Sequence, residues 1–249
     1  MIERILGLSA ALTLLLITIA PTSWAQEERQ NSEPRKITPR PFTAVYLLTS
    51  GPLTLGKMTR TLSLTPEGRY IYDSYSKPIG YAKWFVSTTL KERSEWILHN
   101  GQLRPLSYHY DRSGDKKKLA RHVHITFDWE VMRATNTINN DPWHMAISDN
   151  TLDKLLYHLA VVYDLQRGRT ELSYTVADGG KLKTQRFEII GEERIETPLG
   201  TFNTLKLKTS GKRDTFIWCA PKLDYLPVQL EQSEKRGTLT MQMTALEWH

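Results

Sequence analysis

Hydrophobic and polar positions alternate along most of the chain from Phe42 onward. The runs are short and rich in Val, Ile, Thr, Tyr, Phe and Trp, and residues with turn chemistry separate them. Alternation with a period of two indicates strands that bury one face. Leu62 and Leu64 continue such a pattern from Leu53 and Leu55, with an irregularity expected near Gly56.

Turn signals between these runs recur at regular intervals. Asn100-Gly101 separates two strand-like runs, and this dipeptide favours a two-residue hairpin because both of its positions adopt positive φ. Each turn brings the next run back antiparallel, which predicts roughly a dozen strands. A sheet of this size must curl or close to bury its inner face. We therefore predict a mainly β fold, a curled or barrel-like antiparallel sheet.

One segment in the middle of the chain has helical instead of strand periodicity. Between about residues 149 and 167, apolar residues recur at a spacing of three to four, and Gly168 follows them. Ser148 or Asp149 is the expected N-cap. The pattern predicts one amphipathic α-helix inserted between two groups of strands, packed in the core or lying as a lid over a cavity. The apolar positions are Leu152, Leu155, Leu156, Leu159, Val162 and Tyr163.

The first residues have the pattern of an export signal. An apolar run follows a short charged start, and Ser23-Trp24-Ala25 provides a small-x-small cleavage pattern. We expect residues 1–25 to be removed after Ala25, with no transmembrane segment left and with the periplasm as the location. A polar, proline-containing flexible leader over residues 26–41 and a single β-rich domain over residues 42–249 would then follow.

Charge and cysteine content narrow the expected partners. The formal net charge is +6, and removal of the signal leaves it unchanged. A basic exported protein favours anionic envelope components, such as lipid headgroups or acidic glycans, and disfavours nucleic acid; a soluble surface that is merely basic is the alternative. The single cysteine, Cys219, lies in an apolar strand pattern, which predicts a buried thiol and excludes an internal disulfide.

The search for reaction chemistry gives little. No nucleophile elbow, zinc-protease motif, phosphate loop or paired-cysteine site is present. His122 and His124 share a strand face and could bind a metal with His109 or His144, but neighbouring Arg and Lys side chains disfavour this. Asp128 and Glu130 have the spacing of a glycosidase pair, although a turn explains them better. We predict no catalytic residue, no metal and no cofactor.

Basic and aromatic residues provide the expected ligand contacts. A basic cluster surrounds the predicted turn at Ser113-Gly114, and two tryptophans lie in or beside apparent loops, where they could stack on sugars or line an acyl pocket. The predicted ligand-binding residues are Arg112, Lys116, Lys117, Lys118, Arg121, Trp129 and Trp143.

The second half of the chain resembles a known family. Residues 197–202 read Thr-Pro-Leu-Gly-Thr-Phe, a strand containing Trp218 follows, and Leu226-Pro227-Val228 comes after it. This order is similar to exported bacterial proteins of domain of unknown function family 3108. The resemblance implies a periplasmic, mostly antiparallel β fold, like the curled sheets of periplasmic lipoprotein carriers. It implies no catalytic residues, because the family is defined without an activity.

Together these features favour a non-enzymatic periplasmic protein. We expect it to bind an amphipathic or anionic envelope component, lipid or glycan, in or beside the concave face of the sheet. The alternatives are a carbohydrate-active hydrolase that uses Asp128 and Glu130, and a scaffold partner of an envelope assembly that docks through its sheet edges.

Overall fold

The computed structural model describes residues 37–80, 88–114, 120–138, 141–209, 213–234 and 237–249. The predicted signal peptide lies outside these residues. The described elements, in chain order, are β1 (Phe42–Ser50), β2 (Leu53–Leu64), β3 (Tyr70–Pro78), β4 (Thr89–His99), β5 (Gln102–Ser113), β6 (Arg121–Asp128), β7 (Arg133–Ile138), β8 (Asp141–Ala146), β9 (Thr151–Asp153), α1 (Leu156–Gln166), β10 (Leu172–Asp178), β11 (Lys181–Thr197), β12 (Gly200–Thr209), β13 (Thr215–Ala220), the short 3-10 helix η5 (Pro221–Leu223), β14 (Leu226–Glu234) and β15 (Gly237–Trp248).

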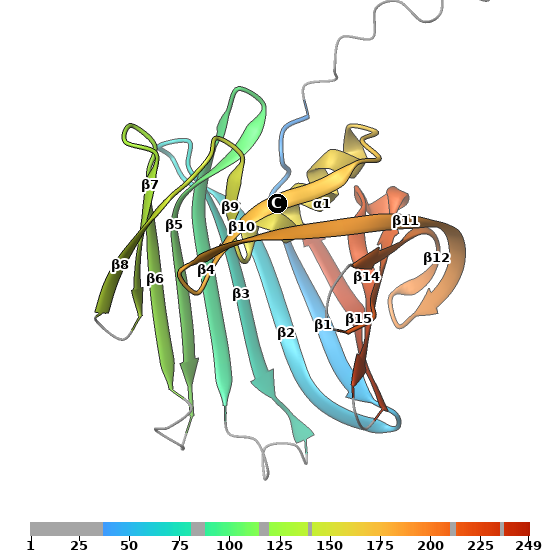
Figure 1. Cartoon of the computed structure of the whole chain (residues 1–249). Helices are drawn as coiled ribbons and strands as arrows, with labels where there is room; N and C mark the ends of the chain where they lie inside the picture. The colour runs from blue at the N-terminus through green and yellow to red at the C-terminus, as the bar shows by residue number, and fades with distance from the viewer. Residues whose placement is uncertain (1–36, 81–87, 115–119, 139–140, 210–212, 235–236) are drawn as a thin grey trace, which may run out of the picture. The chain divides into compact units, whose positions relative to one another are not determined.

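The strands form one curled sheet whose order follows the chain in two arms. From one edge to the other the order is β8-β7-β6-β5-β4-β3-β2-β1-β15-β14-β13-β12-β11-β10-β9, so the first and last strands pair at its centre. The described pairs are antiparallel except β9–β10, which is parallel. The hairpin of β10 and β11 crosses in front of the long strands β3 to β6 (Figure 1). The predicted mainly β, curled antiparallel sheet with one helix is confirmed.

Alternating burial explains why these segments form strands. In β6, Val123, Ile125 and Phe127 are buried, whereas His124 and Thr126 between them are exposed. Residues two apart in a strand point to the same face, so each strand sends one set of side chains into the curl. The inner face therefore carries the core, as the period-two pattern predicts.

The local turn and bulge predictions agree with the structure. Asn100 and Gly101 both have positive φ, 50° and 73°, and join β4 to β5. Between β1 and β2 the register shifts between Leu48 and Thr49, opposite the segment that contains Gly56. The irregularity expected near Gly56 is thus a bulge in the β1–β2 ladder.

Helix α1 is shorter and more deeply buried than the periodicity predicts. It begins at Leu156, not near 149, because residues 151–153 form the edge strand β9. The expected N-caps, Ser148 and Asp149, do not cap it. Instead, the carboxylate of Asp153 accepts hydrogen bonds from the backbone N–H groups of Leu155 and Leu156, both at 2.8 Å.

Most side chains of α1 lie in the core, so the helix fills the curl of the sheet beside β10 (Figure 1). Core packing therefore describes its role better than a lid with one exposed polar face. No helix in the described part of the chain is long and apolar enough to cross a bilayer. The buried members of α1 are Leu156, Leu159, Ala160, Val161, Val162, Tyr163 and Leu165.

The described end of the predicted leader belongs to the folded body. Pro39 is buried, and the Tyr163 hydroxyl donates a hydrogen bond to the carbonyl of Ile37 at 2.7 Å. The N–H of His249 donates to the carbonyl of Pro41 at 3.0 Å. Residues 37–41, expected to be flexible leader, thus pack on the domain because they cover α1 and the C-terminal end of the chain.

The prediction of a buried cysteine is met. In the same core, Trp96 and Trp218 are buried, while Trp84 lies outside the described residues. Cys219 is a free, buried cysteine, and burial raises the pKa of its thiol to about 12. Such a thiol stays protonated and unreactive at neutral pH.

Candidate functional site

The β10–β11 hairpin brings two of the predicted ligand residues together. A Cβ atom at Gly180 would lie 3.2 Å from the indole of Trp143, and one at Gly179 would lie 3.5 Å from the guanidinium of Arg121. Both glycines have positive φ and form the turn of the hairpin. The tip therefore packs on strands β6 to β8 only because these two positions have no side chain.

A small cleft of about 60 Å³ lies beneath this tip, between the hairpin and strands β5 and β6. The ammonium of Lys154 lies 5.4 Å from the ring centre of Tyr110. The acidic side chain that lines the cleft, Asp178, is bound to Lys183 at 2.6 Å. Because that carboxylate is already neutralised, Arg121 and Lys154 leave the cleft positively charged. The lining residues are Tyr108, Tyr110, Arg121, Val123, Ile125, Lys154, Ala177, Asp178 and Gly179.

Arg112 lies beside this cleft, directly opposite Arg121 in the β5–β6 register. Arg112 has an interaction of its own, so Arg121 and Lys154 carry the positive charge of the cleft. Arg121 shares the inner face of β6 with the buried Val123. The predicted basic cluster therefore lies at the rim of the inner face, and Lys116, Lys117 and Lys118 fall outside the described residues.

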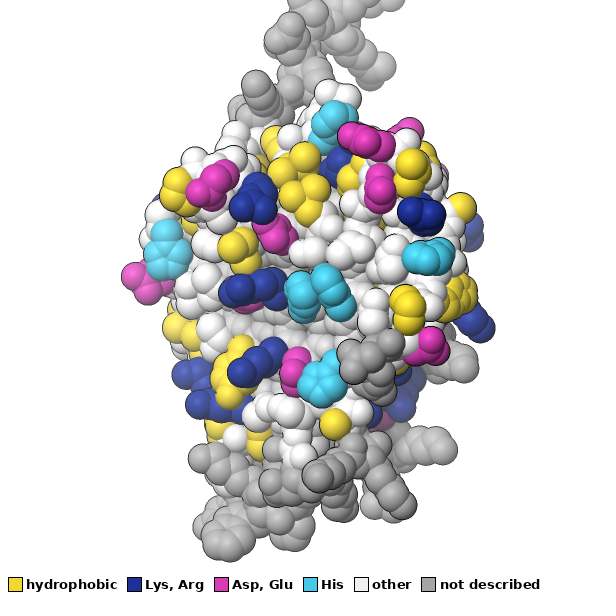
Figure 2. All heavy atoms as spheres, turned by 90° about the vertical axis from the view of Figure 1, so that its left-hand side faces the viewer, with side chains coloured by type: hydrophobic (Ala, Val, Ile, Leu, Met, Phe, Trp, Pro, Cys, Tyr) yellow, Lys and Arg dark blue, Asp and Glu magenta, His cyan; other side chains and the backbone are white. Residues whose placement is uncertain are grey.

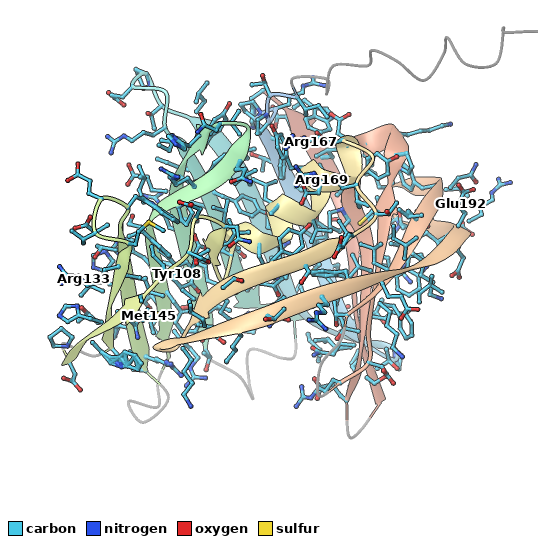
Figure 3. All side chains as sticks on the ribbon, turned by 45° about the horizontal axis from the view of Figure 1, so that its top comes forward. Tyr108, Arg133, Met145, Arg167, Arg169 and Glu192 are labelled. Carbon is cyan, nitrogen blue, oxygen red and sulfur yellow. The ribbon has the colours of Figure 1, made fainter. Side chains whose placement is uncertain are left out.

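The inner wall of the cleft is held by buried polar contacts. The hydroxyl of Tyr108 donates to the carboxylate of Glu92 at 2.6 Å, and burial together with that carboxylate raises the pKa of the tyrosine. Figure 3 shows Tyr108 close to the hairpin tip and Glu192 towards the far end of β11. Tyr108 thus acts as a fixed, protonated wall residue at neutral pH.

Trp129 lies away from the cleft. Its indole N–H donates to the carbonyl of Pro105 at 2.7 Å, and the guanidinium of Arg104 lies 4.7 Å from its ring centre. It follows the last residue of β6, whereas Arg121 is the first, a separation of about 25 Å along an eight-residue strand. Trp129 therefore does not line the cleft that contains Arg121.

A much larger open groove lies at the base of the same hairpin. Its volume is about 1100 Å³, and Leu172, Phe187 and Ile189 provide its apolar surface. Charged side chains of both signs surround these residues, and among them Lys208 and Asp214 form an ion pair at 3.2 Å. The remaining lining residues are Thr170, Glu171, Ser173, Arg186, Glu188 and Thr209.

A third hollow, of about 140 Å³, lies at the C-terminal end of α1. Its two arginines, both labelled in Figure 3, are already engaged. Arg167 donates to the carbonyl of Gly101 at 2.9 Å, and Arg169 forms an ion pair with Asp164 at 3.3 Å. These contacts fasten α1 to the β4–β5 turn, so we assign this hollow a structural role.

The two carboxylates considered for hydrolysis lie in a turn. Strand β6 ends at Asp128, whose carboxylate accepts hydrogen bonds from the backbone N–H groups of Glu130 and Val131 at 3.2 and 3.3 Å. Both acidic residues are exposed. The turn explanation accounts for this pair, since Asp128 stabilises the reversal between β6 and β7.

The histidines considered for metal binding lie on the outer face of β5 to β8. His109 and His124 stack with ring centres 4.0 Å apart, and Nδ1 of His122 lies 3.0 Å from the carboxylate of Asp111. Nδ1 of His144 lies 3.1 Å from the hydroxyl of Thr135. In the described part of the chain no three His, Cys, Asp or Glu side chains are already arranged around a metal position.

Several lining residues were not singled out from the sequence. Lys154 and Tyr110 join the cleft, and Leu172, Phe187 and Ile189 join the groove, through contacts between distant segments. The available signal was the turn at Asp178-Gly179-Gly180, where two consecutive glycines allow a close approach by another strand.

Comparison with solved structures supports the fold. A β-barrel-like protein of domain of unknown function DUF1849 from Brucella abortus aligns with a TM-score of 0.56 and 9% identity, over 84% of this chain and 98% of its own. An exported protein, described as putative, with a YmcC-like fold from Bacteroides fragilis aligns over 84% of this chain and 97% of its own, also at 9% identity, with a TM-score of 0.32. The likeness to the Brucella abortus protein supports the fold alone, because the identity is only 9%.

Sequence comparison gives the family. No curated protein matches the chain. A family model described as a protein of unknown function, DUF3108, matches residues 45–244, which covers nearly all of the curled sheet. This confirms the resemblance carried by residues 197–202, Trp218 and residues 226–228, and the chain belongs to the DUF3108 family.

Proposed function

We propose that this protein is a non-enzymatic binding protein of the cell envelope, exported to the periplasm after cleavage at Ala25. It takes up an amphipathic lipid component beside the concave face of the sheet, in the open groove at the base of the β10–β11 hairpin. The observation that carries the proposal is the groove itself, about 1100 Å³ with an apolar floor and a charged rim.

Size favours the groove over the inside of the curl. Pockets for small molecules usually have volumes of about 300–1,000 Å³. The hollow inside the curl is filled by α1, whose Leu156 is fully buried, and the cavity beside His158 and Arg60 has only about 20 Å³. A ligand of lipid size therefore finds room beside the concavity and not within it.

The chemistry of the groove suits an amphipathic molecule. The half-buried Ile189 offers apolar surface to an acyl chain, whose burial is favourable by roughly 25 cal/mol per Å², and the core residues Leu172 and Phe187 lie behind it as a packed floor. Arg186 and Lys208 on the rim are matched by acidic neighbours, so the rim can receive a polar head group of either sign. A rim of mixed charge favours a polar head without selecting a strongly anionic one.

The cleft beneath the hairpin tip supports the proposed contact with an anionic group of the ligand. The volume of this cleft, about 60 Å³, is close to the volume that about two water molecules occupy in liquid water. The cleft can therefore hold one small anionic group but not an acyl chain. Arg121 and Lys154 make it cationic. We assign to this cleft, with Arg112 and Trp143 at its rim, a head-group contact separate from the groove.

The experiment is a titration of the exported portion with the fluorescent fatty acid 11-(dansylamino)undecanoic acid, competed by unlabelled lauric acid. Ile189 lines the groove, while its neighbour Ile190 is exposed and does not. Ile189→Glu should weaken binding at least about tenfold, or 1.4 kcal/mol, because it places an unpaired charge on the apolar floor. Ile190→Glu is the matched control and should bind like the wild type.

Arg121→Gln forms the second arm of this titration. Weaker binding in this variant would place the probe's carboxylate at the cleft, whereas unchanged binding would place the whole probe in the groove. Absence of saturable, competable binding, or equal effects of the two isoleucine variants, would contradict the proposal. Thermal unfolding of each variant shows whether it is folded.

A further inference from the structure

A square of metal-binding side chains lies on the outer face of β5 and β6. His109 and Asp111 belong to β5, and His122 and His124 belong to β6. In the strand register His109 is directly opposite His124, and Asp111 is directly opposite His122. Since alternate residues share a face, all four project from the same outer surface. Figure 2 shows histidine side chains gathered on this side of the molecule.

We propose that His109 and His124 bind a divalent transition-metal ion, Cu²⁺ most strongly and Zn²⁺ or Ni²⁺ more weakly. The two rings are exposed, nearly parallel at 15°, and 4.0 Å apart between centres. Two nitrogens bound to one ion, each at about 2.0–2.1 Å, lie about 3 Å apart. Stacked rings direct their in-plane lone pairs side by side, so each ring must rotate by about 45–55° for two nitrogens to converge on the ion. Both rings are exposed on the outer face, which leaves them free of core packing, and water occupies the remaining positions.

The order of metals follows from the ligands. Imidazole is a borderline ligand that suits Cu²⁺, Zn²⁺ and Ni²⁺, and among these ions affinity for a given site is highest for Cu²⁺. Hard ions such as Ca²⁺ and Mg²⁺ prefer oxygen ligands, so they should not bind to this pair. In the described part of the chain neither ring has a hydrogen-bond partner that the metal would have to displace.

The surrounding charges permit a cation at this position. Arg93 is directly opposite His109, but its guanidinium makes two hydrogen bonds to the carboxylate of Asp73, at 2.8 and 2.9 Å. Arg121, which in the sequence stands beside His122, faces the other side of the sheet together with Val123. The repulsion suggested by sequence neighbours is therefore reduced by the pleat of the strand.

The adjacent pair of the square supports the same chemistry. The carboxylate of Asp111 lies 3.0 Å from Nδ1 of His122. This carboxylate adds negative charge beside His109 and His124, which favours a cation there.

The test is a calorimetric titration of untagged exported protein with CuCl₂ and ZnCl₂ at neutral pH, together with electron paramagnetic resonance of the Cu²⁺ form. His109→Ala and His124→Ala should each weaken Cu²⁺ binding by at least about tenfold, or 1.4 kcal/mol. His144→Ala is the matched control, because His144 lies on the same face two strands away and bonds to Thr135. The spectrum should show nitrogen coupling that is reduced in either variant.

The pH dependence of Cu²⁺ binding is a second measurement. Binding should fall in acid, because protonated imidazoles do not coordinate. The charged and titratable groups that face the pair are Arg93, Glu95, Asp111 and His122. Unchanged Cu²⁺ affinity in the double variant His109→Ala/His124→Ala, an equal loss in His144→Ala, or no binding by the wild type would overturn the proposal.

Discussion

The carboxyl group of Asp153 is buried where β9 leads into α1. One oxygen accepts the N–H groups of Leu155 and Leu156, and the other accepts the hydroxyl of Ser94 at 2.5 Å. Burial raises the pKa of Asp153 to about 7, although these hydrogen bonds act in the opposite direction. Asp153, which accepts the first N–H groups of the helix, is therefore half protonated near neutral pH.

This shift predicts a pH dependence of stability. Between about pH 4 and 7 the folded protein keeps the proton on Asp153, whereas the unfolded chain has lost it. Raising the pH over this window therefore favours unfolding, by at most about 1.4 kcal/mol per pH unit, and the effect ends above pH 7. Asp153→Asn keeps an oxygen for the helix N–H groups and removes this titration.

The measurement is urea unfolding of the wild type and Asp153→Asn from pH 4 to 8. The unfolding free energy of the variant relative to the wild type should rise with pH up to about 7 and then stay level. Asp128→Asn, at an exposed turn, should show no such trend. A difference that is flat across the whole range would show that Asp153 titrates normally.

Individual residues differ in how far the sequence predicts them. Burial of Cys219 and Trp218 follows from the apolar run around them, and the turn role of Asp128 follows from its place between two strand patterns. The contact between Trp143 and Gly180 does not follow, because 36 intervening residues separate them in the chain. Side chains that meet only through tertiary packing leave no local pattern.

Among the elements, the β10–β11 hairpin most affects the candidate site, because its tip covers the cleft and its base forms the groove. A substitution at the tip should therefore loosen its docking. Gly180→Ala should cost more stability than Gly179→Ala by about 1 kcal/mol. Both strain a positive φ, but at Gly180 the new methyl group would also press on the Trp143 indole at 3.2 Å.

Urea unfolding of the two alanine variants checks this prediction. The NMR signal of the Trp143 indole N–H should move in Gly180→Ala and stay nearly unchanged in Gly179→Ala. Equal destabilisation with an unmoved indole signal would mean that the hairpin tip does not rest on β8.

Helix α1 illustrates what periodicity predicts and what it misses. Apolar spacing locates a helix near its observed place, but Leu152 belongs to β9 and not to the first turn. The difference arises because the strand β9 pairs with β10, and the paired residues, such as Leu152 and Val176, lie 24 positions apart in the chain. A partner at that distance overrides the local helical preference.

The first and last strands of the described domain pair at the centre of the sheet. Phe42 lies opposite Trp248, and β8 and β9, the two edges of the open sheet, are joined by residues 147–150. The two ends of the described domain are therefore adjacent, and both sheet edges belong to the middle of the chain. Such an arrangement favours circular permutation between these edges.

We expect a permutant that links His249 to Ile37 through a short Gly-Ser linker, with new ends between Asp149 and Asn150, to fold. Both new ends are exposed, and no strand pairing is cut. A permutant opened between Leu230 and Glu231 cuts the β14 ladders on both sides and should not fold. Far-ultraviolet circular dichroism and a cooperative urea transition distinguish the outcomes; folding of both would show that β14 is dispensable.

The amino-acid sequence alone determined the strand-rich architecture, the hairpin at Asn100-Gly101, the bulge near Gly56, the presence of a helix and the family. These depend on period-two or period-3.6 burial and on turn residues, which act over a few neighbours. Tertiary structure decided the pairing of β1 with β15, the burial of α1, and the approach of Arg121 and Trp143 to the hairpin tip. These contacts join residues far apart in the chain, and their energy comes from burying surfaces that exist only once the sheet has curled.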